Sequence, residues 1–480
     1  MSRIMGMRGF LTSSIGAPSI GVTCAAALAL PLTLPATAAT AATAATAATA
    51  TPARAERTAA TGRVAEAAVP GRTQSLPLVP RSRSRAVGAA PEQGLYRAGV
   101  RHFSLVGVVW DDPDTELHGR VQARTRSAAS GAWTGWQDIE AQNEEHGADL
   151  GTAERSSGRV RGATAPLWVG DSDGVDVRVR ADAEPAPATG TRGGPTEGQD
   201  ATLPSGLRLE LVDPGDEAPP QGPPADAPRS GTRTDAAVAA YAANTDLVPY
   251  GAPDIPELGR WATERELSRL KGGVPRAKPY IGPRPPIVTR RGWGADESLR
   301  EPGFRYTNTV KAAFVHHTAS GNKYTCSQGS SVIRGIYRYH VKSMGWRDIG
   351  YNFLVDRCGT IYEGRAGGVA KAVMGAHTLG FNTNTMGIAV IGTYGTTKPP
   401  AAAVTAVARL TAWKLGLFGA NPSGKTYLTS GGGNLYPKGK NVRLNVISGH
   451  RDGYATECPG KQLYAKLGTA RSSAARYQGR

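Results

Sequence analysis

The alternation of apolar and polar residues changes character along the chain. Between about residues 93 and 213, short β-branched runs such as HFSLVGVVW, DGVDVRVRA and GLRLELVD are separated by Gly, Asp and Ser. Leu207, Leu209 and Leu211 alternate with Arg208 and Glu210, which is the period of two expected of a half-buried strand. Several such strands without a helical period predict an all-β module, an antiparallel sandwich or small barrel.

Strand and helix signals alternate in the last segment, residues 287–478. KAAFVHH predicts a strand, CSQGSSVIRGIYRYHVKSMGW has apolar residues at helical spacing, and YNFLVDRCGTIYEGR predicts a hairpin turning at Cys358-Gly359. NTMGIAVIGTY follows as a buried strand, and AAAVTAVARLTAWKLGLFG as an amphipathic helix ending at Gly419. This order predicts an α/β fold, a mixed β-sheet flanked by helices.

Three predicted segments lie outside these two regions. Residues 1–38 carry two arginines, an apolar run and small residues, which is typical of a secretory signal peptide. A retained anchor, or lipoprotein processing at Cys24, is the alternative. The Ala/Pro/Arg-rich residues 39–92 predict a disordered spacer, and residues 214–286 a Pro-rich linker with a short helical part. We expect a secreted protein, extracellular or associated with a cell wall, without stable membrane insertion.

The charge of the chain narrows the range of partners. The full chain has a formal net charge of +17, and the leader contributes two basic and no acidic residues, so 17 − 2 leaves +15. A basic exported protein suits anionic wall polymers, and solubility alone is the alternative interpretation. A nucleic-acid partner is not expected, because of the compartment and because no compact basic-aromatic module is present.

Histidines gather in the last segment, which holds five of the eight in the chain. They are His316, His317, His340, His377 and His450. His450 precedes Cys458 in a loop-forming stretch, whereas His316 and His317 end a predicted strand and point to opposite faces of it. Catalytic zinc sites take three protein ligands and leave a fourth position for water. The pattern predicts such a site without deciding which strand histidine takes part.

Four motifs in this order resemble one protein family. FVHHTAS, GWRDIGYNFLVDRCGTIYEGR, GAHTLGFNTNTMGIAVIGTY and GHRDGYATECPG are similar to the peptidoglycan recognition proteins, whose fold is shared by the type 2 zinc-dependent N-acetylmuramoyl-L-alanine amidases. The resemblance covers about residues 287–478, and the layout with a β-rich module resembles exported actinobacterial amidases. It implies hydrolysis of the amide between N-acetylmuramic acid and L-alanine, with peptidoglycan stem peptide and muramic acid as binding partners.

The resemblance implies roles for individual residues. It makes His316, His450 and Cys458 the ligands of Zn²⁺. Tyr351 would polarise the water or steady the oxyanion, and Thr456 would hydrogen-bond the reacting centre. The residues implied to bind substrate are His317, His340, Gly345, Trp346, His377 and Asn382. Of these, the Gly-Trp pair is associated with stems that carry diaminopimelic acid, although Met344 stands where some members place arginine.

The cysteine count is odd once the leader is removed, which leaves Cys326, Cys358 and Cys458. Pairing Cys326 with Cys358 would tie the helix to the hairpin and leave Cys458 for zinc, although the family's disulfide in this area uses different positions. Three rival hypotheses remain. They are a non-catalytic peptidoglycan receptor, an adhesin whose amidase-like domain is incidental, and an enzyme with Cys458 as nucleophile and His450 as base.

Five further residues have expected roles in structure or in positioning. We expect Glu363 and Arg365 to form an ion pair that shapes the hairpin, rather than to supply a second catalytic carboxylate. Asp452 is a candidate for orienting a ligand or its loop. Trp133 and Trp136 are expected to pack at a core or strand edge rather than to stack on sugars.

Overall fold

The computed structural model describes residues 71–81, 90–141, 146–182, 202–215, 234–273 and 279–480. The predicted signal peptide and most of the predicted spacer lie outside these residues. Among the described residues, no helix has the length and apolar character needed to cross a membrane.

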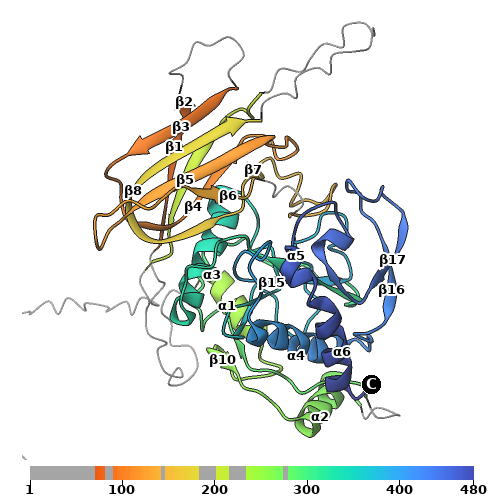
Figure 1. Ribbon diagram of the computed structural model, residues 1–480. Helices are drawn as coiled ribbons and strands as arrows, with labels where there is room; N and C mark the ends of the chain where they lie inside the picture. The colour runs from red at the N-terminus through yellow and green to blue at the C-terminus, as the bar shows by residue number, and fades with distance from the viewer. Residues whose placement is uncertain (1–70, 82–89, 142–145, 183–201, 216–233, 274–278) are drawn as a thin grey trace, which may run out of the picture. The chain divides into compact units, whose positions relative to one another are not determined.

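The described residues between 71 and 215 form an antiparallel β-fold, as predicted (Figure 1). Its strands are β1 (Arg72–Pro77), β2 (Val79–Pro80), β3 (Glu92–Arg97), β4 (Phe103–Trp110), β5 (Gly119–Ser127), β6 (Gln137–Ile139), β7 (Gly162–Ala163), β8 (Leu167–Ala181) and β9 (Arg208–Asp213). The long strand β8 pairs with β4 near its start and with β3 and β5 along the rest of its length. Alternating valines and leucines of β4, β8 and β9 fill the interior, which is the period-two pattern seen in the sequence.

Strands β1 and β2 fall inside residues 39–92, so the prediction of a disordered spacer is wrong for residues 72–80. β1 pairs with β9 over its whole length, from Arg72 opposite Asp213 to Pro77 opposite Arg208. Its sequence, RTQSLP, has almost no apolar residues, and backbone pairing rather than side-chain burial orders it. The Ser75 hydroxyl also donates a hydrogen bond to the carboxylate of Glu210.

The two tryptophans of the β-rich module pack against the faces of neighbouring strands. The Trp133 ring stacks on Tyr96 at a centroid distance of 5.6 Å. The Arg178 guanidinium lies 4.1 Å from the centre of the Trp136 ring. Both tryptophans remain half-buried, in agreement with the expected strand-edge role.

A seven-stranded mixed sheet forms the core of the described residues between 234 and 480, which we call the α/β region, in the order β10-β11-β14-β13-β15-β12-β18. These strands are β10 (Asp254–Ile255), β11 (Ile287–Val288), β12 (Ala312–His317), β13 (Phe353–Val355), β14 (Ile361–Glu363), β15 (Thr385–Val390) and β18 (Ile447–Gly449). The neighbours β13, β15, β12 and the edge strand β18 run parallel, whereas β13 and β14 form the predicted antiparallel hairpin. Every residue of β12 is buried, as expected for a parallel strand covered on both faces. A separate hairpin joins β16 (Lys425–Thr429) to β17 (Asn441–Asn445).

Helices α3 (Gly329–Arg338), α4 (Ala401–Leu417), α5 (Lys461–Tyr464) and α6 (Leu467–Gln478) accompany this sheet. Short helical turns η1 (Cys326–Gln328), η2 (Tyr339–Ser343) and η3 (His450–Asp452) extend or join them. Helix α4 begins after Pro400 and ends before Gly419, whose φ of 74° suits a helix C-terminus. It lies beside α6 (Figure 1) and is buried around most of its circumference, so it is less amphipathic than predicted.

The predicted linker contributes to the α/β region. It contains α1 (Asp235–Ala242), β10 and α2 (Arg260–Leu270), and β10 pairs with β11 of the sheet. The Asn244 amide donates to the buried carboxylate of Glu363 at 2.9 Å. Residues 235–270 are therefore part of the folded α/β region rather than a spacer.

One hydrophobic cluster includes residues of both the β-rich module and the α/β region. Leu105, Trp168 and Val212 share it with Val332 and Ile336 of α3. Just beyond α3, the Tyr339 hydroxyl lies 3.1 Å from the Thr164 carbonyl oxygen and 3.3 Å from that of Val108. The β-rich module therefore packs on α3 through apolar burial and buried hydrogen bonds.

Cys326, at the start of η1, forms a disulfide with Cys358 in the hairpin turn. The predicted pairing is therefore confirmed, and their Cα atoms are 6.0 Å apart. The bond links the helix start to the hairpin and leaves Cys458 outside any disulfide.

Candidate metal centre

Four buried side chains converge at one edge of the mixed sheet, with one ligand atom of each within 4.8 Å of the others. They are His146, His316, His450 and Cys458. The topology explains why two of them meet. Strands β12 and β18 are parallel neighbours in which Val315 lies opposite Gly449, so the next residues, His316 and His450, emerge at the same carboxyl edge.

The donor set suits a zinc ion. Sγ of Cys458 lies 3.8 Å from Nδ1 of His316 and 3.9 Å from Nε2 of His146. A tetrahedral zinc with Zn–N of about 2.1 Å and Zn–S of about 2.3 Å separates such atoms by about 3.6 Å. Burial lowers the pKa of His146 to about 3 and holds that of His316 well below its usual value, so both rings are neutral. Neutral imidazole is the form that binds metals.

The other side of the His316 ring is held in place. Its Nε2 atom lies 3.3 Å from Nδ1 of His377 and 3.4 Å from the hydroxyl of Thr378. These contacts leave Nδ1 directed at Cys458. His317 points to the other face of β12, where its Nδ1 accepts a hydrogen bond from the Tyr394 backbone at 3.2 Å. Of the two strand histidines, His316 is therefore the one that lies in the cluster.

The loop that carries His450 and Cys458 is fixed by its own side chains. The Thr456 hydroxyl accepts a hydrogen bond from the Cys458 N–H at 3.1 Å. Asp452 accepts one from the Gly449 N–H at 2.9 Å and one from the Tyr464 hydroxyl at 2.6 Å. Asp452 therefore orients the loop, which is one of the two roles expected for it.

Tyr351 lies beside the cluster. Its ring centroid is 5.5 Å from that of His316 and 5.8 Å from that of His146, and the side chain is buried. The tyrosine precedes β13, so the neighbouring sheet strand holds it close to the ligands. A phenol in this place can donate a hydrogen bond to a carbonyl oxygen that gains charge near the metal.

Two family models match the chain. The N-acetylmuramoyl-L-alanine amidase model matches residues 306–461, and a model described as Rv3811 N-terminal galactose-binding domain-like matches residues 39–199. Peptidoglycan-recognition protein SC2 of Drosophila melanogaster is 30% identical over 183 residues, which are 38% of this chain and 85% of that protein. The chain belongs to the peptidoglycan recognition protein family.

Other members of the family are similar over the same part of the chain. Peptidoglycan recognition protein 1 of Bos indicus is 33% identical over 184 residues, covering 37% of this chain and 80% of that protein. The solved structure of Drosophila PGRP-LB is 25% identical, covers 38% of this chain and 92% of its own, and gives a TM-score of 0.31. Peptidoglycan recognition protein-LE, solved in complex with tracheal cytotoxin, is 29% identical over 38% of this chain and 92% of its own, with a TM-score of 0.31.

The side chains that the family resemblance assigns to substrate binding lie near the cluster or on the strands around it, and they are buried. His340 packs on Trp346 with ring centroids 4.5 Å apart, and its Nδ1 accepts a hydrogen bond from the Gly350 N–H at 3.2 Å. His377 lies behind His316, and the Asn382 side-chain oxygen accepts the His377 N–H at 2.7 Å. His317, His340, Trp346, His377 and Asn382 are each at most 3% exposed. They are buried rather than lining an open peptidoglycan cleft.

His146 is the member of the cluster that the sequence did not predict. It comes from the β-rich module, far from the family motifs, in the stretch EEHGADLG. Nothing in its local pattern distinguishes it from His102 or His118, which lie in the same module. Only the packing of the β-rich module on the α/β region, which we call the amidase region after the family model that matches residues 306–461, brings it to the rest of the cluster.

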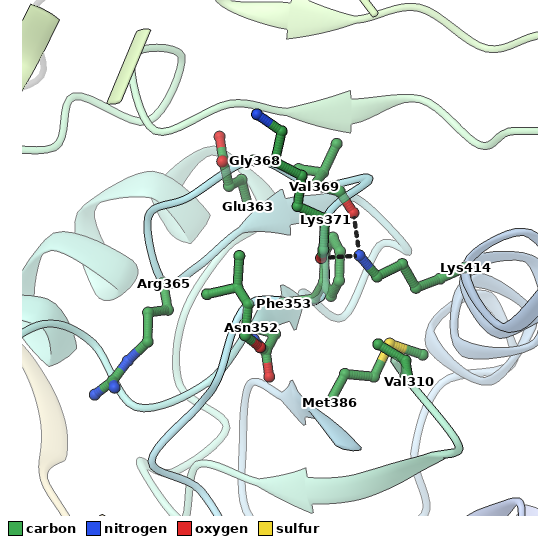
Figure 2. Close-up of a pocket in the computed structure, with 11 residues that line it drawn as sticks. Val310, Asn352, Phe353, Glu363, Arg365, Gly368, Val369, Lys371, Met386 and Lys414 are labelled. Carbon is green, nitrogen blue, oxygen red and sulfur yellow. Dashed lines mark hydrogen bonds between the residues drawn. The ribbon is translucent and has the colours of Figure 1, made fainter. Parts of the chain in front are cut away.

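The predicted ion pair between Glu363 and Arg365 is wrong. Arg365 pairs instead with Glu154 of the β-rich module, at 2.8 and 3.0 Å. Glu363 accepts hydrogen bonds from Asn244 and from the Arg290 N–H, and Figure 2 shows its side chain pointing away from Arg365. Residues two apart would share a face in a continued strand, but β14 ends at Glu363 and the chain bends at Arg365, so the two side chains reach different surroundings.

Glu363 and Arg365 also line the cavity drawn in Figure 2, together with Lys414. The Lys414 ammonium donates to the carbonyl oxygens of Val369 and Lys371 at 2.5 and 2.6 Å. The cavity has a volume of about 10 Å³, which is room for about one water molecule. It is too small for a stem peptide.

Proposed function

We propose that this protein is an exported, zinc-dependent N-acetylmuramoyl-L-alanine amidase acting on peptidoglycan, with a preference for stems that carry diaminopimelic acid. The observation that supports it is the cluster of His316, His450 and Cys458 beside Tyr351. Members of the family without turnover, as the resemblance implies, lack one of the ligands. A complete ligand set with the tyrosine therefore favours hydrolysis over recognition alone.

A bound zinc ion supplies Lewis acidity to the scissile carbonyl and lowers the pKa of water to about 7. The protein's residues supply the rest of the chemistry. Tyr351 donates a hydrogen bond to the oxygen of the scissile carbonyl as negative charge develops there. The C–N bond to L-alanine breaks, the hydroxyl of water remains on the lactyl carbon, and the leaving amine takes up a proton.

Neighbouring side chains hold the proposed metal ligands in position. His377 and Thr378 fix the His316 ring, and Asp452 and Thr456 fix the loop that carries His450 and Cys458. Such supporting contacts orient metal ligands, and their loss costs about 10- to 100-fold in metal affinity or activity. The basic charge of the chain suits attachment to anionic wall polymers.

Muropeptide cleavage tests the proposal. The purified full chain would be stripped of metal, reloaded with zinc, and incubated with diaminopimelic acid-type muropeptides, while mass spectrometry follows release of the stem peptide. We expect cleavage with zinc, none with chelator, and recovery when zinc returns. Cleavage that persists in chelator would refute the metal mechanism, and binding without cleavage by the wild type and by a His146→Ala variant alike would support the receptor hypothesis.

Two variants separate the metal ligand from the other cysteines. Cys458→Ala should lose zinc affinity by about 100-fold or more, together with cleavage, because it removes a ligand rather than a supporting contact. A Cys326→Ser, Cys358→Ser double variant should keep its zinc, because the disulfide is not among the ligands. Parallel reactions with lysine-type muropeptides test the stem preference, and equal rates on both would remove that part of the proposal.

A further inference from the structure

Residues 146–154 of the β-rich module cover the candidate metal centre; we call them the capping segment. They lie between strands β6 and β7 and have no regular secondary structure. Three polar side chains of the segment, His146, Asp149 and Glu154, are no more than 8% exposed. Each of the three contacts the amidase region at a different place.

His146 enters the cluster itself. Its Nε2 atom lies 3.9 Å from Sγ of Cys458, and its ring centroid is 4.6 Å from that of His450 and 5.3 Å from that of His316. Catalytic zinc sites have three protein ligands and an open fourth position, whereas closed four-ligand sites are structural. A fourth protein ligand at this distance would take the position that water and the substrate carbonyl need.

Asp149 and Gly147 occupy the polar groups of Asn382. The Asn382 side-chain nitrogen donates to the Gly147 carbonyl at 2.8 Å and to the Asp149 carboxylate at 2.6 Å. The same Asp149 oxygen accepts the Gly380 N–H at 2.8 Å. A buried carboxylate and carbonyl thus satisfy donors that a muropeptide would otherwise meet in this part of the site.

Glu154 holds the C-terminal end of the capping segment in place. Its carboxylate pairs with the Arg365 guanidinium and lies 3.3 Å from the Arg347 N–H, next to Trp346. Between the two ends, the Gly147 backbone lies near the Trp346 ring, since a Cβ there would be 3.8 Å from it, an ordinary van der Waals distance. The segment therefore runs across the metal ligands and the residues assigned to substrate binding.

From these contacts we propose that the capping segment holds the enzyme in a self-blocked state. In this state His146 is the fourth zinc ligand, and Asp149 and Glu154 keep the segment over the metal centre. The inference rests on the proposed amidase function for its consequence, which is that peptidoglycan is cleaved only after the segment has moved away. The blocking itself is a property of the metal site and can be measured without any substrate.

Cobalt substitution provides that measurement. Co²⁺ would replace zinc in the full chain, and azide would be titrated as a small external ligand while the visible absorption is recorded. With four protein ligands, the wild type should respond weakly. His146→Ala opens the fourth position, so its bands should shift at azide concentrations lower by about 10-fold or more, and its affinity for the metal should fall.

His118→Ala is the matched control, because this histidine belongs to the same module and its side chain is 75% exposed. It should behave as the wild type in the titration. Asp149→Ala, which leaves His146 in place and loosens the segment, should change the azide response in the same direction as His146→Ala. This second variant keeps the test decisive if His146→Ala does not fold.

Cleavage assays then separate the two proposals. With zinc bound, His146→Ala should cleave muropeptides faster than the wild type by about 10-fold or more, and His118→Ala at the wild-type rate. If the azide response differs as expected but no variant cleaves, the block stands and the amidase function fails. Equal azide affinity in the wild type and in both capping-segment variants would overturn the self-blocked state, whatever the cleavage rate.

Discussion

The carboxylate of Glu154 and the guanidinium of Arg365 form a bidentate ion pair, although the two residues are 211 positions apart in the chain. Both side chains are less than 10% exposed, and the Arg365 Nε also donates to the Ile349 carbonyl at 2.9 Å. The pair joins the β-rich module to the hairpin edge of the amidase region. Because it is buried, breaking it leaves a charge without its counterpart.

Glu154→Ala should therefore destabilise the protein strongly. Removing one partner of a buried ion pair costs about 3–5 kcal/mol, whereas an exposed pair contributes about 1 kcal/mol or less. Urea unfolding of the variant would measure the loss. Asp138→Ala is the control, since Asp138 pairs with Arg120 at the surface, with side chains 60% and 66% exposed. A cost for Glu154→Ala no greater than that of Asp138→Ala would contradict the prediction.

Gly345 meets the β-rich module through its backbone. A Cβ at this position would lie 2.0 Å from the Arg159 carbonyl oxygen, and the residue has a φ of 74°. Gly345→Ala should lower the unfolding temperature through both strain and collision, with a backbone cost of about 1–3 kcal/mol before the collision is added. Gly303→Ala isolates the first effect, because Gly303 has a φ of 78° and open space at its Cβ position. Equal losses in the two variants would show that the contact with Arg159 is unimportant.

Local sequence patterns accounted for the strands, the hairpin and a histidine at the end of β12, whereas the choice of His316 over His317 came from the family resemblance. A buried run such as AAFVHH and the loop after a parallel neighbour place their ends at one sheet edge, whatever the rest of the fold does. Strand β1 could not be predicted in this way, because RTQSLP is ordered by pairing with β9 rather than by its own side chains. His146 and the partner of Arg365 depend on how the β-rich module packs, which no local period encodes.

Glu363 has an unusual titration that should affect stability. Burial raises its pKa to about 7 from the usual 4.5, and its Oε1 atom has no hydrogen-bond partner among the described residues. Between pH 4.5 and pH 7 the folded state binds more protons than the unfolded state, so the free energy of unfolding falls as pH rises. Above pH 7 the carboxylate is ionised in both states, and the loss is complete.

Glu363→Gln removes this titration while keeping an oxygen for Asn244 and Arg290. The stability of the variant relative to the wild type should rise between pH 4.5 and 8 by on the order of 3 kcal/mol. Lys414 lines the same cavity, and burial lowers its pKa to about 7, but it is present in both proteins and largely cancels in the comparison. Denaturant unfolding at several pH values provides the measurement, and a difference independent of pH would contradict the assignment.

Tyr351→Phe should separate metal binding from catalysis. The aromatic ring, whose centroid lies 5.5 Å from that of His316, stays in place, so zinc affinity should not change. Loss of the hydroxyl removes a hydrogen bond to the developing oxyanion, a contact worth about 10²- to 10³-fold in kcat. The comparison is best made in the His146→Ala background, where the fourth position is open, with metal content and single-turnover cleavage measured on the same preparations. Because the hydroxyl acts only as charge develops, the KM for muropeptide should stay nearly constant. A fall in zinc content equal to the fall in cleavage would instead make Tyr351 a support for the ligands.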